Sequence, residues 1–75
     1  MTDHELLQLI NKAAMSRETQ LDLSYCELTT LPREIGKLDQ LVSLDLCGND
    51  LIALPPELGQ LRYLTQLDLR HNQLV

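Results

Sequence analysis

The sequence predicts an α/β solenoid, in which an amphipathic helix precedes stacked units made of one short strand and one return segment. Three observations lead to this fold class. Apolar residues recur at helical spacing near the amino terminus, a leucine-rich triplet recurs every 23 residues, and leucine supplies 19 of the 75 residues. Because the chain has no phenylalanine or tryptophan, one branched side chain must fill most of the core, which favours a regular array.

Residues 1–17 are expected to form an N-terminal capping helix. Thr2 is followed three positions later by Glu5, which is a capping-box signature. Leu6 and Ile10 then begin a series of apolar residues at the spacing of one helical face. We expect this face to cover the apolar end of the first repeat, so that Ile10 is buried there.

Residues 18–75 are expected to form repeats with bounds 18–40, 41–63 and a partial unit 64–75. A Leu-Asp-Leu triplet occurs once in each unit, at the same place. The alternation of leucine with polar residues around each triplet predicts half-buried strands near residues 20–24, 43–47 and 66–70. Successive strands should pair in parallel, because the chain returns through the same kind of connection each time.

The segment 41–51, Leu-Val-Ser-Leu-Asp-Leu-Cys-Gly-Asn-Asp-Leu, resembles the leucine-rich-repeat family, whose repeats begin L-x-x-L-x-L-x-x-N-x-L. The return segment 54–61, Leu-Pro-Pro-Glu-Leu-Gly-Gln-Leu, resembles the L-P-x-x-I-G-x-L subclass of bacterial, plant Ras-group-related and Roco-type repeat arrays. The resemblance covers residues 18–75. It implies a right-handed coil with parallel strands on a concave face and an irregular or short-helical convex side.

A structural ladder is expected where the chain leaves each strand. Cys26, Asn49 and Asn72 occupy the same position in the three units. A buried amide at this place can donate to and accept from backbone groups that have lost their strand partners. We therefore expect Asn49 and Asn72 to be buried and stacked, and Cys26 to fill the same space under the capping helix. Gly36 and Gly59 are expected to end short helical turns on the convex side.

The side chains that alternate with the buried leucines should form the concave face, where proteins that this chain resembles usually bind their partners. The candidate partner-binding residues are Gln20, Asp22, Ser24, Tyr25, Ser43, Asp45, Cys47, Gln66, Asp68, Arg70 and His71. The three aspartates among them stack in one row at strand spacing. Two interpretations of that row are open: an acidic stripe for a basic partner or divalent cation, or solvated residues retained when the repeat was duplicated.

Several functional classes are not expected. The net charge is −5 and no basic cluster occurs, which disfavours a nucleic-acid partner. An acidic amino terminus and the lack of any bilayer-length apolar run predict a cytoplasmic protein without a membrane partner. The two cysteines are expected to be free thiols.

No catalytic, metal or cofactor site is expected. Cys26 should point inward and Cys47 outward, so neither a disulfide between them nor a zinc site with His4 is favoured. Cys47 and His71 should be near neighbours on adjacent strands, but no third residue orients the imidazole. We therefore do not expect an enzyme.

The expected function is a protein–protein interaction scaffold, as the N-terminal part of a longer intracellular repeat protein in signal transduction. One alternative is a regulatory repeat segment of a signalling enzyme such as a Roco-like GTPase. Another is a structural or engineered minimal repeat that forms a homo-oligomer through its open C-terminal edge. This last alternative follows from the partial third unit, whose leucines are expected to face solvent.

Overall fold

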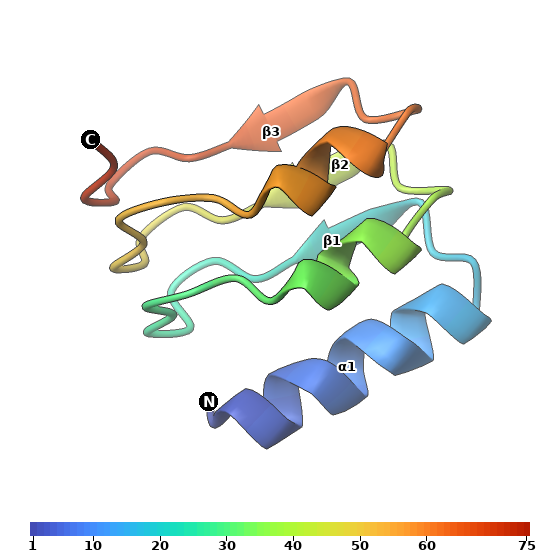
Figure 1. Cartoon of the computed structure of the whole chain (residues 1–75), viewed down its shortest axis with the longest axis horizontal. Coiled ribbons are helices and arrows are strands. Elements are labelled where there is room, and N and C mark those ends of the chain that lie inside the picture. Colours follow the sequence, from blue (N-terminus) through green and yellow to red (C-terminus); the bar gives the residue numbers. More distant parts are fainter.

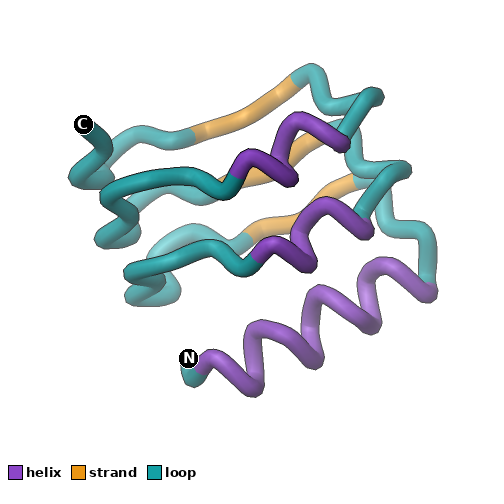
Figure 2. The backbone as a smooth tube through the Cα atoms, in the orientation of Figure 1, coloured by secondary structure: helices purple, strands orange, loops and turns teal.

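The computed structural model describes residues 1–75 and has two layers (Figure 1). One layer holds the helices, which are α1 (Asp3–Met15) and the 3₁₀ helices η1 (Arg33–Lys37) and η2 (Pro56–Gln60). The other holds the strands, which are β1 (Gln20–Asp22), β2 (Ser43–Asp45) and β3 (Gln66–Asp68). Figure 2 shows that loops connect the two layers in every repeat. The chain therefore has the α/β repeat architecture that the sequence predicts.

The strands form one parallel sheet in the order β1-β2-β3. Leu21 pairs with Leu44, and Leu44 pairs with Leu67, so the sheet register equals the sequence period. This confirms the predicted pairing, although each strand has three residues where five were expected. Hydrogen bonds between repeats continue past the strand ends, as where Tyr25 N donates to Cys47 O at 2.9 Å. The repeats thus stay bonded after the strand geometry has ended.

A left-handed residue lies three positions after the end of the strand in every repeat. Tyr25, Gly48 and His71 have φ values of 52°, 73° and 60°. This conformation turns the chain off the sheet, and it costs a residue with a side chain about 1 kcal/mol relative to glycine. Only the second repeat uses glycine there.

The core lies between the two layers and consists of leucine, isoleucine and alanine side chains. Leu23 and Leu46, on the segments that follow β1 and β2, are fully buried. Ile35 of η1 and Leu38 close the core from the helix layer. A regular aliphatic core of this kind agrees with the leucine-rich composition, although residues 64–75 contribute only partly buried side chains such as Leu64 and Leu69.

Helix α1 begins with the predicted capping box. The hydroxyl of Thr2 accepts a hydrogen bond from Glu5 N at 3.1 Å, and the Glu5 carboxylate accepts one from Thr2 N at 2.9 Å. These bonds lower the pKa of Glu5. The helix lies beside η1 (Figure 1), and its buried residues Leu6 and Ile10 join the core of the repeats. No helix in the structure is both long and apolar enough to cross a membrane.

Asn49 ties the first two repeats together through its side-chain amide. Its Oδ1 accepts hydrogen bonds from the backbone N–H groups of Cys26 and Leu28, both at 3.0 Å. Its Nδ2 donates to the carbonyl oxygens of Leu23 at 2.9 Å and Leu46 at 3.0 Å. The amide thereby satisfies four backbone groups that the sheet leaves without partners.

Asn72 makes three of the four equivalent hydrogen bonds between the second and third repeats. Its Oδ1 accepts from Leu51 N at 3.0 Å, and its Nδ2 donates to Leu46 O at 2.8 Å and Leu69 O at 3.2 Å. Asn49 is 4% exposed, whereas Asn72 is only half-buried. The asparagine amide therefore bonds neighbouring repeats together at two different degrees of burial.

Gly36 and Gly59 lie in the last turns of η1 and η2, one residue before these helices end. Glycine is required at position 36 because the next repeat packs closely against it. A Cβ added to Gly36 would lie 2.5 Å from Gln60 Oε1 and 3.1 Å from Glu57 O. A Cβ added to Gly59 would meet no atom within 4 Å.

Candidate functional site

The outward side chains of the three strands and of the residues that follow them form one open surface, called here the strand face. Its members are the predicted partner-binding residues other than Cys47, namely Gln20, Asp22, Ser24, Tyr25, Ser43, Asp45, Gln66, Asp68, Arg70 and His71. Parallel pairing sets them in rows, because residues one repeat apart are strand partners. A shallow hollow of about 580 Å³ lies over β2 and β3, lined by polar side chains such as Ser43, Gln66 and Arg70. Such an open, polar surface suits a large partner better than an enclosed small molecule.

Each of the three aspartates of the strand face makes the same kind of local hydrogen bond. The Oδ1 of each accepts the backbone N–H of the residue two positions later, at 2.9 Å for Asp22, 2.9 Å for Asp45 and 3.1 Å for Asp68. The carboxylate thus satisfies a backbone donor where the chain leaves the strand. Neither interpretation of the row from sequence included this role. This role is compatible with both interpretations, and the known tendency of aspartate to bond the backbone two residues on could have revealed it.

The two outer aspartates also have side-chain partners. The hydroxyl of Ser24 donates to Asp22 Oδ1 at 2.6 Å, and its hydrogen bonds lower the pKa of Asp22. Arg70 contacts both oxygens of Asp68, with Nη2 to Oδ2 at 2.7 Å and Nε to Oδ1 at 3.0 Å. These bonds lower the pKa of Asp68 to about 2 and raise that of Arg70. Asp45, in the centre, bonds only the backbone N–H of Cys47.

Cys47 was predicted to be an exposed partner contact, and the structure corrects this. Its exposed fraction is 6%. The ring of Tyr25, from the preceding repeat, lies against Gly48, where an added Cβ would overlap the ring atoms. The Cys47 thiol donates to the Tyr25 hydroxyl at 3.7 Å. The thiol therefore belongs to a contact between repeats, while Tyr25 itself is 71% exposed.

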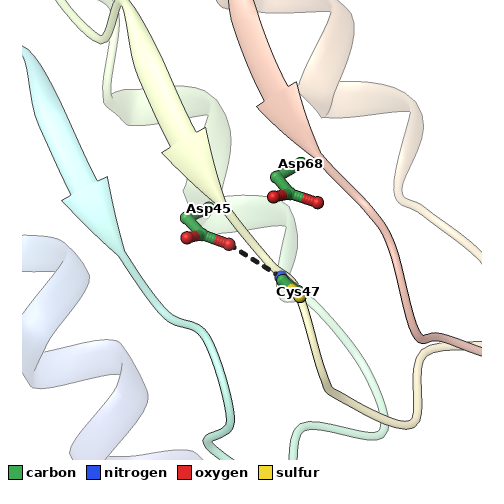
Figure 3. A group of neighbouring side chains, drawn as sticks. All are labelled: Asp45, Cys47 and Asp68. Carbon is green, nitrogen blue, oxygen red and sulfur yellow. Dashed lines mark hydrogen bonds between the residues drawn. The ribbon is translucent and has the colours of Figure 1, made fainter.

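Figure 3 shows Asp45 and Asp68 at the ends of neighbouring strands, with Cys47 just beyond β2. Their donor atoms all lie within 4.8 Å of one another. Asp68 is already bonded to Arg70, and the Cys47 thiol is bonded to the Tyr25 hydroxyl. These donor atoms therefore have hydrogen-bond partners within the chain.

The predicted neighbours Cys47 and His71 differ in their surroundings, because the thiol is covered and the imidazole is exposed. Cys26 is partly buried, and its thiol donates to Ser24 O at 3.4 Å. Both cysteines are free thiols. The Cys47 thiol is thus hydrogen-bonded to the Tyr25 hydroxyl, which is not a base that could activate it.

Comparison with known proteins places this geometry in a family. Among solved structures, a leucine-rich-repeat protein of Leptospira interrogans is similar, with a TM-score of 0.52 and 34% sequence identity. The match covers 87% of this chain and 23% of that one, so this chain spans about a quarter of the length of that protein. No curated protein matches the chain. A family model described as leucine rich repeat matches residues 19–74. The chain therefore belongs to the leucine-rich-repeat family.

Proposed function

We propose that this chain is a protein-interaction module that binds its partner on the strand face. Leucine-rich-repeat domains generally mediate contacts between proteins. The observation that carries the proposal is the register of the sheet, which sets corresponding side chains of three repeats side by side on one open surface. A rigid scaffold that presents different side chains at strand spacing is suited to reading an extended surface of another protein.

Tyr25 and Arg70 are the proposed main contacts. Tyrosine and arginine are enriched among the residues that contribute most to protein interfaces. Tyr25 is 71% exposed, and the side chain of Arg70 is 77% exposed. Tyr25 is packed on Gly48, and Arg70 is held by Asp68, so both lose less conformational freedom on binding than unrestrained side chains would. Both therefore combine accessibility with order.

A pair of photo-crosslinking variants tests which face binds. A photoreactive phenylalanine derivative replaces Gln66 on the strand face or Lys37 on η1, and both positions are exposed. The partner should be captured through position 66 and not through position 37. Capture through position 37 alone, or equal capture through both, would contradict the proposal.

The affinity for the captured partner then tests the proposed contacts. Tyr25→Ala and Arg70→Ala should each weaken binding about tenfold, the effect of losing about 1.4 kcal/mol. Tyr63→Ala is the matched control, because Tyr63 is also exposed, at 53%, but lies between η2 and β3. A thermal melt of each variant separates lost binding from lost folding. If Tyr25→Ala binds as well as Tyr63→Ala does, Tyr25 is not a main contact.

We also propose that residues 1–17 act as a cap for the first repeat. The support is the burial of Ile10, which is 0% exposed and packs into the same core as the repeats. Ile10→Ala should lower the free energy of unfolding by roughly 2–5 kcal/mol. Met15→Ala on the same helix, at a position 86% exposed, should change it by less than about 0.5 kcal/mol. An unchanged melting temperature for Ile10→Ala would rule out the cap.

The repeats are further proposed to be part of a longer, right-handed array of 23-residue units, with bounds 18–40, 41–63 and 64–75. The similar Leptospira protein, of which this chain spans 23%, supports the longer array. Right-handed connections are the rule between parallel strands. The coding sequence beyond residue 75 tests the array: further repeats would support it, and an immediate stop would contradict it.

A further inference from the structure

We draw no further inference here: the strongest candidate, the cluster of Asp45, Cys47 and Asp68 donor atoms at the ends of β2 and β3, carries nothing because it is an acidic pair beside one cysteine, each already bonded within the chain, and nothing else in the structure points to a ligand there.

Discussion

The second and third repeats share a sequence pattern but differ in their surroundings. Their strands have the same length and pair in register, and each is followed by a left-handed residue. Yet Leu44 of β2 is 1% exposed, while its counterpart Leu67 of β3 is 39% exposed. The reason is that β2 has a strand on both sides and β3 on one. In this fold the repeat sequence determines the backbone of a unit, and the neighbouring units determine how much of it is buried.

The largest expected difference between these repeats is in their asparagines. Asn49→Ala should lower the free energy of unfolding by about 3 kcal/mol, because buried N–H groups of the first repeat would lose their acceptor. Asn72→Ala should cost about 1 kcal/mol, since water reaches its half-buried surroundings. Urea denaturation of both variants measures the difference. Equal losses would show that the burial of the amide has no effect on its contribution.

A smaller difference is expected between the two glycines of the helix layer. Gly36→Ala should destabilise the fold by about 1 kcal/mol, because the new methyl group would press on Glu57 and Gln60 of the next repeat. Gly59→Ala meets open space and should be neutral within about 0.5 kcal/mol, or slightly stabilising. Thermal melts of the two variants compare them directly. A destabilised Gly59→Ala would mean that the surface over η2 is not open in solution.

The smallest expected effect is the pH dependence of the Asp68–Arg70 pair, which is exposed to solvent. The folded-state pKa of Asp68 is about 2, below the ordinary value of 3.8, so the folded state favours the ionised carboxylate. The contribution of the pair to stability is therefore present above about pH 4 and is lost as the pH falls to about 2. Carboxyl-carbon NMR titration should give a midpoint near pH 2 for Asp68. Arg70→Ala should raise that midpoint, and an unchanged midpoint would contradict the pairing.

The sequence was sufficient to predict most of the fold. Leucine spacing predicted the helix, the parallel strands and their register, because a periodic pattern constrains every unit in the same way. The strand ends were predicted less well. Gly48 is a typical left-handed residue, and the 23-residue register places Tyr25 and His71 at the same position, although only the glycine by itself strongly favours this conformation.

The candidate site was predicted in its rows but not in its contacts. Alternation along each strand predicted rows of corresponding side chains, and the sheet register sets the strand residues of the three repeats in such rows. The burial of Cys47 could not be predicted, because it depends on the direction of the Tyr25 ring, and Tyr25 is itself a left-handed residue. The aspartate hydrogen bonds were predictable in principle, since they are local and recur in all three units.

The strand-end aspartates have a consequence for how this surface can be altered. Because each carboxylate serves its own backbone, the aspartate row should be kept constant when the protein is diversified. Gln20, Ser43 and Gln66 have no side-chain hydrogen bond within the chain, and one leucine separates each of them from the aspartate of its strand. A combinatorial library could therefore vary these three positions freely, and new binding specificities could arise on an unchanged frame.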